Sequence, residues 1–274
     1  MMPTETRGGA AVEPAIREPA LFHEDERLIA AVFARSSQEE LDALVFENEL
    51  ERRRLEKKAL AAYFDLPEQN VFSLRQTHGV TGVRATPDDC ANNTEPFFAQ
   101  GDALYTDSPG ILLCVRTADC LPLFLASRAF CGIIHAGWRG LAFGVLENNL
   151  GEFQRTRDAG STLFAGPCIG ADAYEVGPEV ARLFPEARRA SDQGKFLLDL
   201  RASCRRNIAD FHGDAAGNRG STEDRGEPPE FREIFAGCTY RQNDLYYSHR
   251  RGDRGRNLNV IMLKKRAEKK AYAQ

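Results

Sequence analysis

The sequence lacks the features that define several large classes of protein. No apolar stretch approaches the roughly 20 residues that cross a bilayer, and residues 1–19 contain no hydrophobic core of a secretion signal. The seven cysteines are scattered, odd in number and without the Cys-x-x-Cys spacing of a structural zinc site. We therefore expect a cytoplasmic protein with reduced cysteines and no membrane partner.

An excess of positive charge is also absent. The 36 lysines and arginines are outnumbered by 40 aspartates and glutamates, which gives a formal net charge of -4 at pH 7. A protein that binds a nucleic-acid backbone needs a basic surface to replace its counterions. We expect no nucleic-acid partner. Histidine and tryptophan are scarce as well, with five and one in the whole chain.

Apolar residues are plentiful, and their pattern predicts the fold. Hydrophobic residues make up 42% of the 274 residues, enough for one sizeable core. Short β-rich segments bounded by Gly, Pro and Asp are interspersed with helical patterns. We predict a single α+β domain with mixed β-sheets flanked by helices, and a metal site at strand-to-loop ends. The predicted strands cover residues 28–33, 71–74, 103–106, 111–115, 123–125, 131–134, 163–165 and 260–263, and the predicted helices cover 38–64, 141–153, 178–185 and 200–211.

Composition shifts set the expected domain boundaries. Residues 26–264 are predicted to form one catalytic domain. Residues 1–25 are expected to be a disordered or loosely packed tail, and residues 265–274 a basic C-terminal tail. Residues 213–230 have no apolar residue after Ala216, so they are expected to form a surface insertion.

Three residues of the metal-ligand type follow predicted strands. His78 lies beyond residues 71–74, Cys120 lies beyond residues 111–115, and His135 ends residues 131–134. Each is close to Gly, Asp or Pro that turns the chain, so the three side chains can converge on one point. Two imidazoles, a thiolate and one open position form a catalytic zinc site, where a bound water has a pKa of about 7. We predict His78, Cys120 and His135 as catalytic residues and as ligands of Zn²⁺.

Short blocks that include these residues resemble a known family in their order and identity. The chain is similar to the laccase-domain family, once labelled multicopper polyphenol oxidase and now described as purine nucleoside phosphorylases with adenosine deaminase activity. The resemblance runs from about Phe33 to Leu263. The blocks are Gln-Thr-His-Gly at 76–79, Gly-Asp-Ala-Leu-Tyr-Thr at 101–106, Thr-Ala-Asp-Cys-Leu-Pro at 117–122, His-Ala-Gly-Trp-Arg-Gly at 135–140, Gly-Pro-Cys-Ile-Gly at 166–170, Tyr-Glu-Val-Gly at 174–177, Cys-Thr at 238–239 and Ser-His-Arg-Arg at 248–251.

The resemblance implies a cofactor and a reaction. The motif histidines and cysteine of the family fall on the same three residues, which would hold zinc. Adenosine, inosine, guanosine or methylthioadenosine would react with phosphate to give the free base and ribose 1-phosphate, and adenosine would also be deaminated. Copper, the ion of the older label, is disfavoured because multicopper oxidation needs many more than five histidines. No oligomeric state is predicted.

The resemblance and the residue types also suggest partners for the substrate. Arginines suit a bidentate grip on phosphate, and Arg35 and Arg251 are the expected substrate-binding residues. Arg35 matches an arginine that precedes a Gly-Gly-Val-Ser loop in the family, but Ser36 and Ser37 follow it here. The chain has His249 where the family block has tyrosine. Further phosphate candidates are Arg139, Arg250 and Arg256.

Several roles stay open at this level. Asp119 is either a general acid or base beside the metal, or a hydrogen-bond partner of a ligand or of loop amides. Trp138 either stacks on a purine or packs between its loop and the sheet. A second function is a Cys-His amide hydrolase that edits peptidoglycan precursors, with Cys120 as its nucleophile. Bound zinc would argue against it, because a thiolate on zinc attacks poorly. A third is a copper-dependent polyphenol oxidase.

Overall fold

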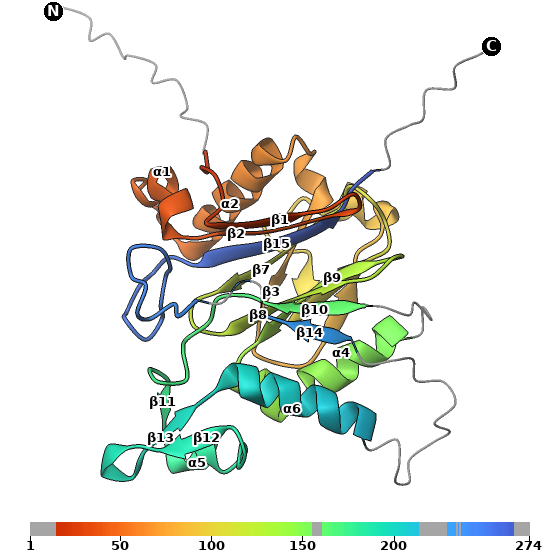
Figure 1. Ribbon diagram of the computed structural model, residues 1–274. Helices are drawn as coiled ribbons and strands as arrows, with labels where there is room; N and C mark the ends of the chain where they lie inside the picture. Colours follow the sequence, from red (N-terminus) through yellow and green to blue (C-terminus); the bar gives the residue numbers. More distant parts are fainter. Residues whose placement is uncertain (1–14, 155–160, 214–228, 234, 236, 266–274) are drawn as a thin grey trace, which may run out of the picture.

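Two six-stranded β-sheets stack face to face, and helices cover both outer faces (Figure 1). The computed structural model describes residues 15–154, 161–213, 229–233, 235 and 237–265. Both sheets mix parallel and antiparallel pairs, so the predicted α+β fold with mixed sheets is confirmed. The first sheet contains, in spatial order, β1 (Leu21–Glu24), β2 (Leu28–Phe33), β15 (Asn257–Leu263), β7 (Leu112–Thr117), β3 (Val71–Arg75) and β5 (Ala99–Gln100), and the second contains β14 (Glu230–Arg232), β10 (Thr162–Ala165), β8 (Leu121–Ala126), β9 (Cys131–Ala136), β6 (Ala103–Thr106) and β4 (Gly82–Arg84).

The central strands are apolar along their whole length because both of their faces are buried. In β7, Leu113 and Val115 belong to the core between the sheets. Leu112 and Cys114 point the other way, into the core beneath α2 (Glu49–Tyr63). The outer face of the second sheet packs against α4 (Val145–Gln154) and α6 (Leu200–Gly213). Runs without alternating polar residues are typical of strands covered on both sides.

The helices follow the predicted pattern with two local differences. Residues 38–64 form α1 (Glu39–Asp42) and α2, which begins after Asn48, whose side chain accepts a hydrogen bond from the Glu51 amide. The predicted helix at 141–153 is broken because Gly144 has a φ of +93°. It becomes α3 (Trp138–Ala142) and α4, whereas the predicted helix at 178–185 is a single turn, α5 (Pro178–Ala181).

Two parts of the prediction from sequence are wrong. Residues 21–24 do not belong to a tail, because β1 pairs with β2 in antiparallel fashion and forms an edge of the first sheet. A small sheet of β11 (Glu175–Val176), β13 (Phe196–Leu198) and β12 (Arg188–Ala190) was not predicted, since its strands are only two or three residues long.

The remaining boundary predictions fall largely outside the described residues. Residues 1–14, residues 214–228 of the expected insertion and residues 266–274 of the expected C-terminal tail belong to that undescribed part. In the described part, no helix combines the length and the hydropathy needed to cross a bilayer.

Candidate metal centre and its cavity

The three predicted ligands meet where the two sheets are joined by the chain. Strands β3 and β7 are parallel neighbours, so their carboxyl ends lie at the same edge of the first sheet. The loop after β3 carries His78, and the loop after β7 carries Cys120. Cys120 leads directly into β8 of the second sheet, where Pro122 pairs with His135 of β9. The strand order therefore brings all three residues to one place.

Their donor atoms form one cluster. The side-chain nitrogen and sulfur atoms of His78, Cys120 and His135 all lie within 4.8 Å of one another. The two imidazole rings are 4.8 Å apart between centroids and inclined at 74°. His135 is buried, Cys120 is half-buried and His78 is exposed. Zinc binds nitrogen and sulfur at about 2.0–2.3 Å and keeps an open position in catalytic sites, so this donor set fits one zinc ion.

A buried carboxylate holds two of the ligands in place. Asp102 accepts hydrogen bonds from the amides of Thr77, His78 and Gly79 at 3.2, 2.9 and 2.7 Å, and from the Thr77 hydroxyl at 3.0 Å. Its Oδ1 also lies 2.8 Å from Nδ1 of His135. Burial would raise the pKa of Asp102, but the bonds from His135 and the loop amides lower it to about 2. The ionised Asp102 thus accepts a hydrogen bond from Nδ1–H of His135, which leaves Nε2 of His135 for a metal.

The backbone at the cluster adopts a conformation that few side chains tolerate. His78 has a φ of +59°, and Asp119, the neighbour of Cys120, has a φ of +86°. Non-glycine residues in this left-handed region are uncommon and cost free energy. The bonds to Asp102 stabilise the turn at His78 and so fix the direction of its imidazole.

The electrostatics of the cluster favour a thiolate. Burial would raise the pKa of the Cys120 thiol, but the adjacent imidazoles of His135 and His78 lower it to about 6. Burial likewise would lower the pKa of His135, which the Cys120 sulfur and Asp102 raise instead, to about 9. A thiolate is the form that binds zinc, and it is also the form that attacks a carbonyl carbon. The geometry is therefore compatible with both the zinc enzyme and the Cys-His amide hydrolase that the sequence suggested.

The cluster leaves no space for a side chain at Gly137, and this gives a first prediction. A Cβ atom at this position would lie 2.9 Å from Sγ of Cys120 and 3.2 Å from Cδ2 of His78. We expect Gly137→Ala to push the ligands apart and to weaken zinc binding by at least about tenfold, a loss of the size seen when the support of a metal ligand is disturbed. Zinc affinity is measured by competition with a chelator.

The matched control is Gly151→Ala, in the interior of α4, where an added Cβ would meet no atom within 4 Å. This variant should keep its zinc and gain about 0.5–1 kcal/mol of stability, because alanine is the better helix former. Equal zinc affinity in the two variants would show that the donor atoms do not act as one ligand set.

The cluster opens into a cavity with a strongly positive wall. The cavity has a volume of ≈ 490 Å³ and includes all three predicted ligands. Of its charged wall residues, Glu49 and Asp119 are carboxylates, and five are arginines. Anionic ligands are therefore favoured over cationic ones. The arginines are Arg53, Arg116, Arg139, Arg250 and Arg256.

The sequence and fold match proteins that are already known. Residues 48–264 match the family model for multi-copper polyphenol oxidoreductase laccase. The chain belongs to this family. It is 33% identical over 218 residues to the purine nucleoside phosphorylase YfiH of Shigella flexneri, covering 76% of this chain and 79% of that protein. It is also 33% identical over 214 residues to the purine nucleoside phosphorylase of Deinococcus radiodurans, covering 76% of each.

A known crystal structure has the same fold. The crystal structure of YlmD from Geobacillus stearothermophilus superposes on this chain with a TM-score of 0.69 at 24% identity. The superposition covers 92% of this chain and 100% of that one. The resemblance drawn from the short sequence blocks is thus confirmed. In the described part of this laccase-family chain, His78, Cys120 and His135 form the one cluster of three or more residues with metal-ligand geometry.

Asp119 has a structural role that fits the second of its two readings. Its carboxylate accepts hydrogen bonds from the hydroxyls of Thr239 and Ser248 at 2.7 and 3.0 Å and from the Arg250 amide at 2.7 Å. Both oxygens are thereby engaged. Asp119 lies in the loop after β7 that carries Cys120, and its bonds fasten residues 239–250 to this loop. This fixes the wall of the cavity that carries His249 and Arg250.

The two expected substrate-binding arginines, Arg35 and Arg251, are not among the residues that line this cavity. Arg251 donates to the carbonyls of Thr239, Tyr240 and Tyr246 and pairs with Asp253, so its guanidinium ties loops together. Arg35 pairs with the same Asp253 at 2.8 Å and lines a separate cavity of ≈ 600 Å³. Residue type alone does not show that a nearby carboxylate already engages both arginines.

Other wall residues were missed by sequence reasoning, or assigned only in part. Glu49 and Arg53 come from α2 and Arg116 comes from β7, and none of the three lies in one of the short sequence blocks that resemble the family. Tyr174 lies in a block that signalled the family, and its place in the wall could have been inferred from that block. Trp138 packs against the core of the second sheet, as its second reading expected, and it also lines the cavity, with Arg139 4.4 Å above its ring.

Proposed function

We propose that the chain is a zinc-dependent purine nucleoside phosphorylase that also deaminates adenosine. The observation that carries this proposal is the single cavity in which a His, Cys and His donor set faces a wall of arginines. Phosphorolysis needs a phosphate bound beside the nucleoside. The arginines of the cavity wall suit the phosphate, and the aromatic side chains of the wall suit the base. The names of the relatives in Shigella flexneri and Deinococcus radiodurans support the same reaction.

The metal would be held by His78, Cys120 and His135. Zinc at such a site supplies Lewis acidity, which lowers the pKa of a water molecule to about 7. The protein's own part is to keep the donors ready. Asp102 accepts a hydrogen bond from Nδ1–H of His135, and the two histidines keep Cys120 as a thiolate.

The phosphate and the base would be bound by the cavity wall. Among the described residues, Arg256 forms no ion pair with a carboxylate, so its charge remains available to phosphate, and Arg139 and Arg250 add two more charges without a carboxylate partner to the wall. Bidentate bonds from guanidinium groups orient phosphate as well as neutralise it. Tyr174 and Trp138 provide aromatic surface in the same cavity, which suits a purine ring.

The test is a paired assay on adenosine. With the zinc-loaded protein we expect adenine release that depends on inorganic phosphate, and inosine formation that does not. Removing zinc with a chelator should abolish both, and adding zinc back should restore both. If neither product forms, the proposal is wrong.

The amide hydrolase is the second candidate, and the closeness of the Cys120 sulfur to a nitrogen of His135, within 4.8 Å, favours it. Its reaction needs a free thiolate and no metal. Cleavage of amide substrates by the metal-free protein, with no release of adenine by the zinc-loaded protein, would decide for it. Zinc bound at one ion per chain with the activities above decides against it.

A further inference from the structure

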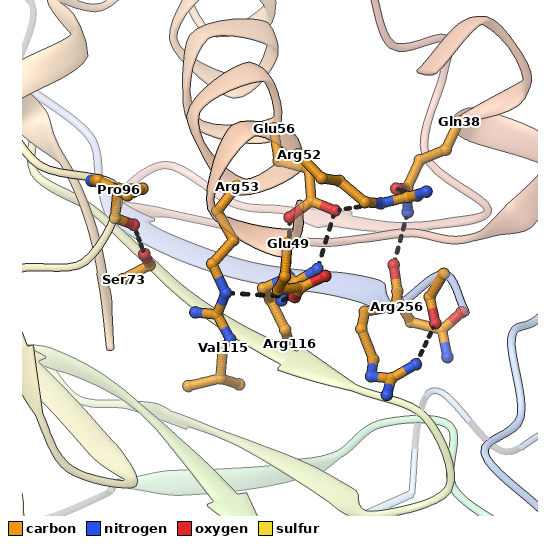
Figure 2. A network of polar contacts seen from close by, with 12 residues as sticks. Gln38, Glu49, Arg52, Arg53, Glu56, Ser73, Pro96, Val115, Arg116 and Arg256 are labelled. Atoms are coloured by element: carbon orange, nitrogen blue, oxygen red, sulfur yellow. Dashed lines mark hydrogen bonds and ion pairs between the residues drawn. The ribbon is translucent and has the colours of Figure 1, made fainter. Parts of the chain in front are cut away.

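One corner of the cavity is already occupied by a carboxylate of the chain. Glu49, the first residue of α2, bonds to Arg116 and lies 3.3 Å from Nε of Arg53 (Figure 2). The Arg116 side chain is 5% exposed, whereas that of Glu49 is 57% exposed. The arginine is thus a fixed part of the wall, and the glutamate reaches it from the solvent side.

The arginines of this corner are crowded. Burial, and then the charge of Arg116, lower the pKa of both Arg53 and Arg256. Glu56 stabilises Arg116 from beneath, at 2.7 Å from its Nε, and also pairs with Arg52. The carboxylates do not balance the guanidinium groups. Four arginines, Arg52, Arg53, Arg116 and Arg256, face the carboxylates Glu49, Glu56 and Asp42.

Part of the corner is unused even with Glu49 in place. Arg256 donates only its Nη1, to the carbonyls of Asp253, Arg254 and Gly255. Its Nε and Nη2 have no hydrogen-bond partner among the residues that the structure describes. These two atoms form one edge of the guanidinium, which is the edge that binds two oxygens of a phosphate.

Glu49 is not needed to hold α2 in place. Asn48 caps the helix through the amide of Glu51, and the Glu49 side chain is more exposed than buried. The carboxylate can therefore leave the corner without uncovering apolar surface. Its departure would leave three cavity arginines beside the amino end of a 15-residue helix, where the helix dipole also favours an anion.

We propose that Glu49 is a resident anion in the phosphate site, and that inorganic phosphate replaces its carboxylate on Arg53 and Arg116 and also binds the free edge of Arg256. The proposal rests on the proposed phosphorolysis in naming phosphate as the ligand. Phosphate carries more negative charge at neutral pH than a carboxylate and has more acceptor oxygens. The exchange therefore favours phosphate, while Glu49 keeps the arginines partly neutralised between turnovers and lowers the affinity for phosphate.

The test is the binding of inorganic phosphate to the full-length, zinc-loaded chain without nucleoside, measured by isothermal titration. Glu49→Gln removes the competing charge and should tighten phosphate binding roughly five- to tenfold, as expected for one charge a few ångströms away in a partly solvated site. In the phosphorolysis assay, the KM for phosphate should fall by the same factor and the KM for adenosine should stay constant. Glu49→Ala should show the same direction.

Glu51→Gln is the matched control, since it makes the same change of charge in the same helical turn on a residue outside the cavity wall. Its phosphate affinity should stay within about twofold of the parent chain. Arg53→Gln should weaken phosphate binding in both the parent chain and the Glu49→Gln background. Unchanged or weaker phosphate binding by Glu49→Gln overturns the proposal, because Glu49 would then only orient the arginines. Tighter binding without any phosphorolysis supports the anion site and rejects the proposed reaction.

Discussion

Cys120→Ala is expected to lose its zinc and both activities while the fold stays intact. Cys120 is the one sulfur among the clustered donors and lies within 4.8 Å of a nitrogen of each imidazole. Loss of an outer partner of a ligand costs 10–100-fold in metal affinity, so loss of a ligand itself should cost more than about 100-fold. Zinc per chain, adenine release and inosine formation measure the result. The thermal unfolding of the metal-free protein should change little.

The matched control for this variant is Cys90→Ala. Cys90 is half-buried in the 3-10 helix Pro87–Asn92, which takes no part in the cavity wall, and its Sγ donates a long hydrogen bond of 3.8 Å to the Thr86 carbonyl. This variant should keep zinc and both rates. Full rates for Cys120→Ala would show that the chemistry happens elsewhere.

Asp102→Ala is expected to destabilise the whole site as well as the metal. Asp102 is 0% exposed and accepts hydrogen bonds from three amides, one hydroxyl and the His135 ring. Alanine would leave these donors without an acceptor and release the turn at His78. We expect a loss of about 3–5 kcal/mol in the free energy of unfolding, as for other broken buried charge networks, and at least about tenfold weaker zinc binding.

The two effects are separated by denaturant unfolding of the metal-free protein and zinc competition on the folded protein. Asp107→Ala is the control, because Asp102 and Asp107 flank β6 on either side, and Asp107 pairs with Arg84 at the surface. It should change stability by less than about 1 kcal/mol. If Asp102→Ala lowers the free energy of unfolding no more than Asp107→Ala does, the hydrogen bonds of Asp102 do not stabilise the loop that carries His78.

The sequence predicted most of the strands of the two large sheets because burial on both faces leaves a plain signal. Residues 131–134 and 260–263 are continuous apolar runs, and they lie within β9 and β15 in the middle of the sandwich. The edge strand β1 gave no such signal, since its residues alternate between half-buried and exposed. Short strands depend on the neighbours they pair with, and those neighbours are distant in the sequence.

The predicted ligands His78, Cys120 and His135 were identifiable because each lies in or just after the end of a strand, and residue type limits what can bind zinc. The roles of the charged residues were not. Asp102 and Asp119 look alike in sequence, yet one holds the metal ligands and the other fastens a distant loop.

By itself, the sequence of this protein determined the layers of the core and the candidate metal donors, because hydrophobic pattern and ligand chemistry are local properties. Only the tertiary structure decided which arginines face the cavity. Arg251 is turned inward to loop carbonyls, whereas Arg116 meets Glu49 across 67 residues of sequence. A charged side chain takes its role from its partners, and these partners are brought together by folding.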